Sequence, residues 1–336
     1  MKSFLLAFVV TLSFLPTAGL AQAGSESSAA MAANAKAKPA YEIPIVTKTL
    51  ANGFEIIVLP DSSIPLVTVE LAVRNGSFTE PPELNGLSHL YEHMFFKTNR
   101  AALVYRCEMV RFRNVQAYRN LGCDAELQNK PANLDPSYMG LIDGLGIVNN
   151  ATAREEVVQY YFTTTSPNIL PAMKFIKDAA RYPVFNEEEF AREKEVVLGE
   201  LERNMSQPGF YLQQASLDRL FYKYPTRKNP GGTRESVSAA TTDKMRLIQS
   251  RYYVPNNSAL VVTGDVKPQD IFIEAEKLFG DWARAKNPFV EFPLVEHPPL
   301  TKSEGAIVSQ PVQNVFVQIS WQGAIGWQGR RGNVCG

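Results

Sequence analysis

Two of the three histidines in this 336-residue chain, His89 and His93, lie four residues apart, and Glu92 directly precedes the second. On an α-helix, residues i, i+3 and i+4 share one face, so both imidazoles and the carboxylate would point toward one metal ion. Histidines at this spacing are typical zinc ligands, and the order is the inverse of His-Glu-x-x-His. A hydrogen-bonded His–Glu pair in the core is the alternative, but the motif arises by chance in only about one such chain in several hundred.

A helix is predicted over residues 84–97, around this motif. Apolar residues recur at i, i+3, i+4, i+7 and i+8, which is the pattern of a helix face that packs on a core. Asn85 or Ser88 could cap the start of the helix. The ligand face lies beside the apolar face, where a cleft wall would be. The apolar stripe consists of Leu87, Leu90, Tyr91, Met94 and Phe95.

A catalytic zinc site usually takes three protein ligands, so one more is needed. His297 lies in the proline-broken stretch VEHPPL and is a poor candidate, because no rigid element would hold it. The stretch FNEEEFAREKEVVLGELERN predicts a helix over 187–205, capped by Asn186 and buried along Phe190, Val197 and Leu201. Glu193 and Glu200 share one face of it. Such glutamates are more often a solvated surface, so the residues alone leave both interpretations open.

These residues resemble the pitrilysin or insulinase family of zinc metallopeptidases, in which the inverted motif is followed by a glutamate on a downstream helix. The similarity covers about residues 45–285. It rests on LANGFEIIVLP at 50–60, VELAVRNGSFTEPPELNGLSHLYEH at 69–93, NATAREEVVQYYFT at 150–163, RYPVFNEEEFAREKEVVLGELERN at 181–204 and RYYVPNNSALVVTGDVKPQDIFIEAEKLFGDW at 251–282.

The resemblance implies a role for each of seven residues. His89, His93 and Glu200 would bind Zn²⁺, Glu92 would be the general base, Glu193 would be an auxiliary acidic catalytic residue, and Asn150 and Ala151 would bind the substrate beside the metal. In the family, a second homologous domain supplies an Arg and a Tyr to the active site. The resemblance therefore also implies that a further domain, or a homologous subunit, completes the site.

The order of the predicted elements indicates an α+β fold, a sheet with packed helices, as in a pitrilysin-like metallohydrolase domain. This catalytic domain is expected over 45–285. Strands are predicted at 55–59, 66–74, 158–164 and 259–263, and helices at 84–97, 169–181, 187–205, 241–251 and 269–280.

One departure from the family is the distance of 107 residues from His93 to Glu200, where the family usually shows about 75 to 80. We assign the extra residues to an insert at about 100–143, which contains five arginines. A solvated surface loop is the expectation, and contact with an acidic partner is the alternative. Cys107 and Cys123 in this insert could form a disulfide in an oxidising compartment, which would leave Cys335 unpaired.

The two ends of the chain differ from its middle. Residues 1–23 combine a charged start, a short apolar run and an Ala-Gln-Ala site, which is the pattern of a signal peptide for export, with the periplasm as the expected location and no membrane anchor. Residues 24–44 are small and polar and predict a disordered lead-in. Residues 286–302 predict a linker. The alternating segment at 308–321 predicts the first strand of a second domain, truncated within 303–336.

Charge and motif together set the expected function. The chain carries 34 basic and 34 acidic side chains, and removing the signal peptide with Lys2 leaves a formal charge of −1. This balance excludes strong attraction to nucleic acid or to an anionic membrane. We expect a zinc endopeptidase acting on peptides or small proteins, in which Glu92 activates a zinc-bound water. The alternative is a non-catalytic or partner-dependent peptide-binding subunit, although a structural zinc site has no need for Glu92.

Overall fold

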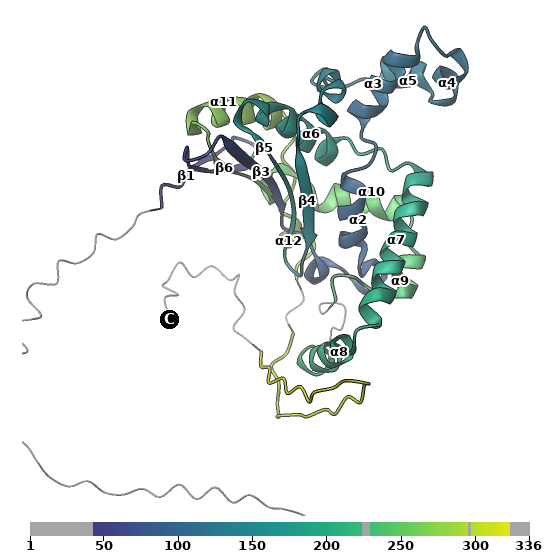
Figure 1. The fold of residues 1–336 in the computed structure, drawn as a ribbon, viewed down its shortest axis with the longest axis vertical. Helices are drawn as coiled ribbons and strands as arrows, with labels where there is room; N and C mark the ends of the chain where they lie inside the picture. Colours follow the sequence, from purple (N-terminus) through teal and green to yellow (C-terminus); the bar gives the residue numbers. More distant parts are fainter. Residues whose placement is uncertain (1–42, 224–228, 295–296, 323–336) are drawn as a thin grey trace, which may run out of the picture. The chain divides into compact units, whose positions relative to one another are not determined.

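The computed structural model describes residues 43–223, 229–294 and 297–322. Among these residues, the helices and strands lie between Val46 and Glu291. The predicted signal peptide, most of the lead-in and Cys335 fall outside the described residues. Within those residues, none of the helices is both long and apolar enough to cross a lipid bilayer. The fold is α+β, as predicted: one sheet with helices packed on it (Figure 1).

The sheet has six strands in the order β1-β2-β6-β3-β5-β4. β2 and β6 run parallel, and the other neighbours are antiparallel. In β5, buried Val158, Tyr160 and Phe162 alternate with half-buried residues, because successive side chains point to opposite faces and only one face carries the core. The strands are β1 Val46–Thr49, β2 Glu55–Pro60, β3 Leu66–Val73, β4 Val148–Ala153, β5 Val158–Thr165 and β6 Ser258–Gly264.

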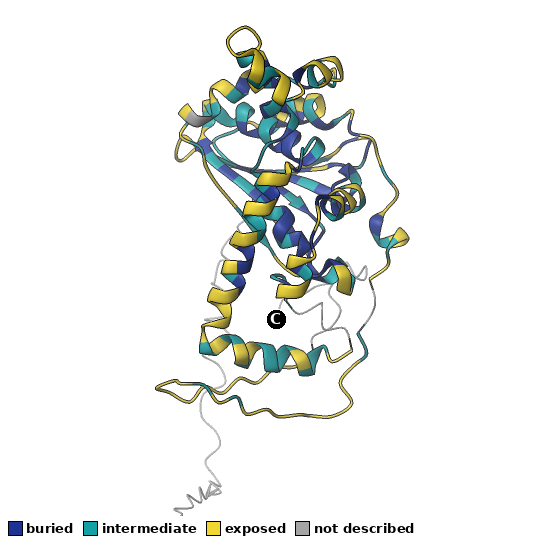
Figure 2. Ribbon diagram, turned by 90° about the vertical axis from the view of Figure 1, so that its right-hand side faces the viewer, coloured by how far each residue is buried: buried dark blue, intermediate teal, exposed yellow. Residues whose placement is uncertain are grey.

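Helices cover the buried face of this sheet. The helix that carries the histidine motif, α2 (Leu87–Phe95), buries all five residues of its predicted apolar stripe, and the Phe95 ring stacks on Tyr160 with centroids 3.7 Å apart. Figure 2 shows the buried residues concentrated between the sheet and these helices. The other predicted helices are also present: α6 Ile169–Arg181, α7 Glu187–Met205, α10 Thr242–Tyr252 and α11 Pro268–Phe279. Three helices were not predicted: α8 Pro208–Leu220, α9 Arg234–Ser238 and α12 Pro288–Glu291.

The expectation that the insert is a surface loop was wrong. It folds into α3 (Arg100–Val110), α4 (Val115–Asn120) and α5 (Cys123–Gln128), followed by short 3-10 turns. The side chains of Asn99 and Asn114 cap α3 and α4, and a disulfide joins Cys107 to Cys123. Capped helices with a crosslink and a small core of their own are an ordered unit. That core consists of Ala101, Val104, Leu134 and Tyr138.

The insert is anchored to α6 by buried polar contacts. The Tyr138 hydroxyl donates to Oδ2 of Asp178 at 2.9 Å, and Nζ of Lys177 donates to the carbonyl of Asn133 at 3.0 Å. Asp178 is fully buried and pairs with Lys177 at 2.8 Å, so the charge is compensated inside the protein. The insert is therefore held against the catalytic-domain fold.

The predicted strand at 308–321 does not form. Residues 297–322 contain neither helix nor strand in the structure, and Val315, Val317 and Ile319 are exposed. An alternating sequence becomes a strand only when a neighbouring strand accepts and donates its backbone hydrogen bonds. Within the described residues, no strand pairs with this segment.

Candidate metal centre

The carboxylate of Glu80 holds the first turn of α2. Neither of the predicted cap residues, Asn85 and Ser88, caps the helix with its side chain. The carboxylate of Glu80 accepts hydrogen bonds from the backbone N–H of Ser88 at 2.6 Å and of Gly86 at 2.8 Å. The helix begins after Gly86, whose φ of 82° lies in the left-handed region. Burial raises the pKa of Glu80, and the hydrogen bonds from Ser88, Gly86 and Asn85 oppose that shift. A buried acidic group thus holds the first turn of the motif helix.

The two histidines and Glu200 converge on one point. Oε2 of Glu200, on α7, lies 3.5 Å from Nε2 of His89 and 3.6 Å from Nε2 of His93. The two imidazole rings meet edge to face with centroids 4.9 Å apart. Two neutral imidazoles and one carboxylate are a common donor set of catalytic zinc. These three residues, which the sequence analysis assigned to zinc from the family resemblance, therefore fit a metal ion.

Glu92 borders the same point from α2. Its Oε2 lies 3.7 Å from Nε2 of His89, and donor atoms of His89, Glu92 and His93 lie within 4.8 Å of one another. Glu200 falls outside that tighter group, but one of its carboxylate oxygens lies close to both Nε2 atoms, so the geometry allows either Glu92 or Glu200 to complete a donor set with the two histidines. The side chain of Glu92 is 13% exposed.

Glu193 contacts the other side of His93. Its Oε2 lies 3.2 Å from Nδ1 of His93, and its Oε1 pairs with Nζ of Lys97 at 2.5 Å. A carboxylate on Nδ1 fixes the tautomer in which Nε2 carries the lone pair for a metal. The auxiliary role expected of Glu193 is thus compatible with a contact to a ligand. Sequence reasoning missed Lys97, although it lies one helical turn after His93.

Burial sets the protonation of the two motif groups. It lowers the pKa of His89 from 6.5 to about 4, an effect that His93 reinforces and Glu200 opposes. A neutral His89 is the form that binds a metal. Burial also raises the pKa of Glu92 from 4.5 to about 7, with His93 opposing and Glu200 adding to the shift. A carboxyl group with a pKa near 7 is suited to accepting and releasing a proton near neutral pH.

The expected substrate edge is strand β4, which the sequence analysis did not predict as a strand. β4 is the last strand of the sheet and pairs with β5 through Asn150↔Tyr161 and Ala151↔Tyr160. It lies against α2, and Asn150 is exposed. Within the described residues, the outer edge of β4 carries no strand partner, so its backbone groups can pair with an extended peptide.

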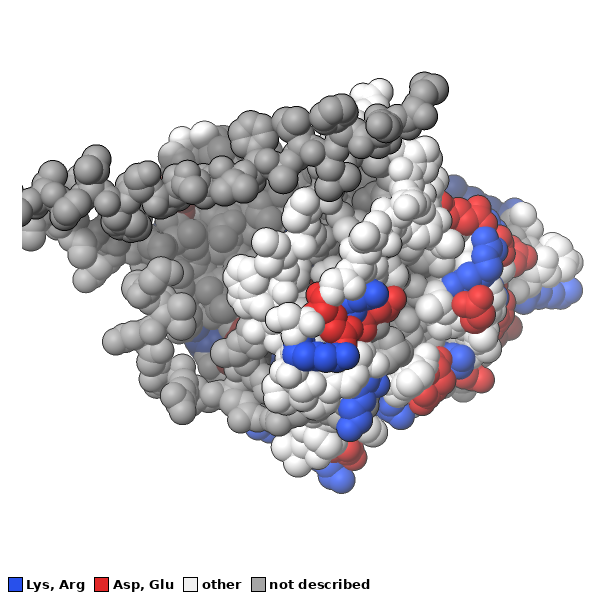
Figure 3. Space-filling model, turned by 90° about the horizontal axis from the view of Figure 1, so that it is seen from below, with Lys and Arg blue, Asp and Glu red and all other residues white. Residues whose placement is uncertain are grey.

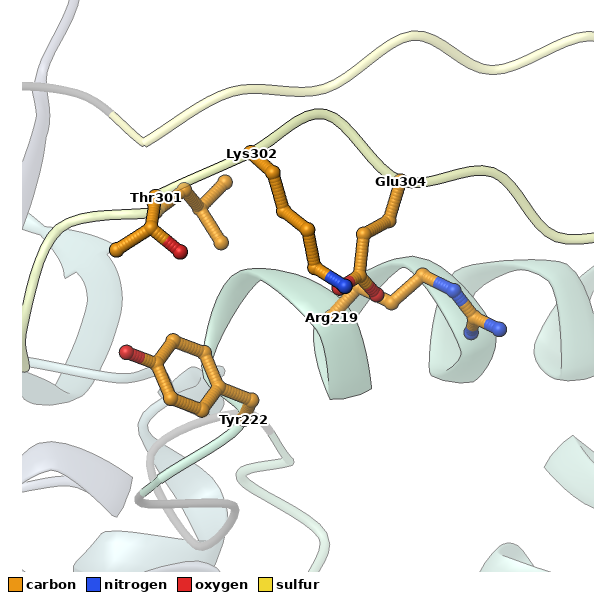
Figure 4. Close-up of a pocket in the computed structure, with 6 residues that line it drawn as sticks. Arg219, Tyr222, Thr301, Lys302 and Glu304 are labelled. Atoms are coloured by element: carbon orange, nitrogen blue, oxygen red, sulfur yellow. The ribbon is translucent and has the colours of Figure 1, made fainter.

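Three other features of the described surface lie outside the predicted site. His297 accepts a hydrogen bond at Nε2 from the backbone N–H of Lys223, as expected for a histidine outside the metal set. A cavity of about 170 Å³ beside α8 contains none of the predicted site residues (Figure 4). Figure 3 shows acidic and basic side chains interspersed on the visible face. The cavity beside α8 is lined by Arg219, Tyr222, Leu300, Thr301, Lys302 and Glu304.

Models of known protein families match two segments of the chain. The family model "Insulinase (Peptidase family M16)" matches residues 56–106, which include the whole histidine motif, and the model "Peptidase M16 inactive domain" matches residues 239–330. Over these segments the chain is similar to peptidase family M16, the insulinase family. The resemblance stated from the sequence is thereby confirmed.

Curated relatives of the chain carry the names of zinc proteases. The chain is 22% identical over 260 residues to zinc protease PqqE of Helicobacter pylori, covering 77% of the chain and 51% of the relative. It is 26% identical over 262 residues to the uncharacterized zinc protease YmxG of Bacillus subtilis, covering 76% and 55%. The chain thus spans about half the length of the curated relatives it matches.

Solved structures show the same fold. A protease from Helicobacter pylori superposes with a TM-score of 0.58 at 21% identity, over 73% of this chain and 52% of that one. The first half of the periplasmic protease PqqL from Escherichia coli superposes with a TM-score of 0.56 at 18% identity, over 72% and 47%. At these identities the likeness concerns the fold alone.

Proposed function

We propose that this chain carries the zinc centre of an endopeptidase that cleaves peptides or small proteins. The observation that carries the proposal is the convergence of Nε2 of His89 and Nε2 of His93 on one oxygen of Glu200. Glu92, a half-buried carboxylate beside this point, is not needed as a ligand if Glu200 fills that place, and it therefore favours catalysis over a structural zinc. The names of the relatives support a zinc protease.

Each site residue has a distinct task in the proposed reaction. Bound zinc would supply Lewis acidity for the scissile carbonyl and would lower the pKa of a water molecule. Glu92 accepts a proton from the attacking water and passes it to the leaving amine. Glu193 orients His93 through Nδ1. Asn150 and Ala151 lie on β4, where the peptide backbone pairs as an added strand with little dependence on sequence.

The complete active site is proposed to need more than these residues. Because the chain spans about half of its curated relatives, we expect a homologous segment or subunit to supply the Arg and Tyr that the family resemblance implies. Export to the periplasm is proposed from the signal-like pattern of residues 1–23, and one structural neighbour is titled a periplasmic protease.

Zinc binding by variants of α7 tests the ligand set without relying on activity. Glu200→Gln should weaken zinc binding by at least 10-fold in calorimetric titration, because the anionic ligand is lost. The matched control is Glu195→Gln on the same helix, since Glu195 is exposed and should leave the affinity unchanged. Equal zinc affinity of Glu200→Gln and Glu195→Gln would remove Glu200 from the ligand set.

A further inference from the structure

The insert exposes apolar side chains where its first two helices meet. α3 ends at Val110 and α4 begins at Val115, so the chain turns between them. Phe112 in this turn is 89% exposed, and Met109 and Val115 on either side of it are 43% and 59% exposed. Single exposed apolar residues are ordinary on a protein surface, but three around one turn indicate a contact surface. They belong to the insert tip, defined as residues 109–121.

Basic side chains accompany the exposed ring. Arg111 and Arg113 flank Phe112 in the sequence, and the guanidinium carbon of Arg111 lies 5.4 Å from the centre of the Phe112 ring. Arg119 lies four residues after Val115 on α4, so these two side chains share one helix face. The insert tip contains no Asp or Glu, and its three arginines form no ion pair with any described residue. The tip therefore carries a local charge of +3.

The insert tip is an ordered part of the fold. The disulfide between Cys107 and Cys123 closes a loop that contains the whole tip, and the side chain of Asn114 caps α4. α4 packs on α3 and α5 and buries none of its own residues (Figure 1). The turn therefore presents Phe112 on a fixed backbone, which reduces the conformational entropy lost when the tip binds a surface.

The combination of apolar and basic side chains suits the surface of an anionic lipid bilayer. There, an apolar side chain enters the boundary between headgroups and acyl chains, and arginines pair with lipid phosphates. The near-neutral chain as a whole excludes strong long-range attraction, but at physiological ionic strength charges act over only about 8 Å. An acidic protein would also attract the arginines, but it would have to supply a matching pocket for Phe112. A bilayer supplies its apolar layer at every point.

We propose that the insert tip binds the surface of a bilayer that contains anionic phospholipids. Phe112 enters the headgroup boundary with its apolar neighbours beside it, while the three arginines of the tip contact phosphates. The contact is reversible, because one ring and three arginines bind far less firmly than a membrane-spanning helix. The proposal is independent of the metal centre, and it would place the proposed peptidase at a membrane that its described helices do not cross.

Sedimentation with lipid vesicles tests the proposal. The chain from Gly24 onward is used, because the apolar run at 4–15 would bind vesicles by itself. It should bind vesicles of phosphatidylcholine and phosphatidylglycerol in equal parts roughly 10-fold or more tightly than pure phosphatidylcholine, and salt should weaken this binding. Phe112→Ser should lower the partition coefficient roughly 10-fold, because no ring enters the apolar region. Phe112→Trp keeps an aromatic ring and should bind like the wild type.

Matched substitutions separate the insert tip from the rest of the surface. Phe316→Ser removes a ring that is 67% exposed and has no basic residue within five positions, so it should leave binding unchanged. Arg111→Gln combined with Arg113→Gln should lower binding to the mixed vesicles roughly 10-fold. Lys267→Gln combined with Lys286→Gln removes the same charge from exposed positions outside the insert and should change binding little.

Three results would overturn the proposal. They are equal sedimentation of the wild type and Phe112→Ser, equal losses in the tip variants and their controls, and binding to polyglutamate without binding to the mixed vesicles. The last result would assign the surface to an acidic protein. Because Phe112, Arg111 and Arg113 are exposed, their substitution should leave the urea unfolding midpoint unchanged, which separates a loss of lipid binding from misfolding.

Discussion

At the scale of single residues, the proposed metal centre depends on burial as much as on the identity of its candidate ligands. His89 and His93 are half-buried on α2, and the carboxylates of Glu193 and Glu200 reach them from α7. Burial favours the neutral imidazole of His89, which is ready for a metal. The same burial penalises the ionised form of Glu92. Without a metal ion, the ionised carboxylate of Glu92 therefore lowers the free energy of unfolding near neutral pH.

The raised pKa of Glu92 predicts a pH-dependent stability difference. Between pH 4.5 and about 7, folded Glu92 retains a proton that the unfolded chain has released, so its contribution to stability decreases as the pH rises through this window. In metal-free protein, Glu92→Gln should therefore stabilise the fold more at pH 8 than at pH 5. The difference should be up to about 3 kcal/mol, from a shift of about 2.5 pKa units at 1.36 kcal/mol each.

Urea unfolding at the two pH values measures this difference. Glu195→Gln is the control, because Glu195 is exposed on α7 and its substitution should change stability little at either pH. If Glu92→Gln and Glu195→Gln showed the same pH dependence, the burial argument for Glu92 would be wrong.

At the scale of elements, local periodicity predicted the helices that carry the candidate ligands. The apolar stripe of α2 and that of α7 each lie within one continuous segment, so their helical period can be recognised from the sequence alone. The pairing of α7 with α2 required the family resemblance, because no local pattern tells which helices meet. The cap on α2 was missed because Glu80 reaches it from a turn outside the helix.

Other elements could not be predicted because they depend on partners. β4 is polar and exposed along much of its length, so it lacks the alternation of a strand and forms through its pairing with β5. The segment at 308–321 has the alternation but no strand partner among the described residues. The helices of the insert were not predicted, because its many arginines indicated a solvated loop. Asn99 and Asn114 are nevertheless typical helix N-cap residues that can be recognised in the sequence.

The anchor between the insert and α6 predicts a stability cost for one hydroxyl. Tyr138→Phe removes a donor from the fully buried Asp178 and should destabilise the protein by about 1–3 kcal/mol in urea unfolding. Tyr118→Phe removes a comparable hydrogen bond to Asp124 in an exposed setting and should cost less than about 0.5 kcal/mol. Equal costs for the two substitutions would show that the buried contact does not anchor the insert.

At the scale of the whole molecule, the proposed metal centre joins two segments that lie far apart in the chain. His93 and Glu200 are 107 residues apart, yet α2 and α7 pack against each other. Figure 1 shows α3, α4 and α5 together near α6, so the insert does not separate α2 from α7. The insert therefore leaves the contact between α2 and α7 intact.

Hydrolysis of a quenched-fluorescent peptide library by the zinc-loaded chain, compared with Glu92→Gln and Glu195→Gln, tests the central claim most directly. We predict cleavage by the wild type and Glu195→Gln, and a loss of at least 100-fold in kcat/KM for Glu92→Gln, because proton transfer contributes roughly 10²- to 10⁴-fold. Zinc content should be equal in all three proteins. Cleavage by Glu92→Gln at the wild-type rate, with zinc bound, would contradict the assignment of Glu92 as the general base.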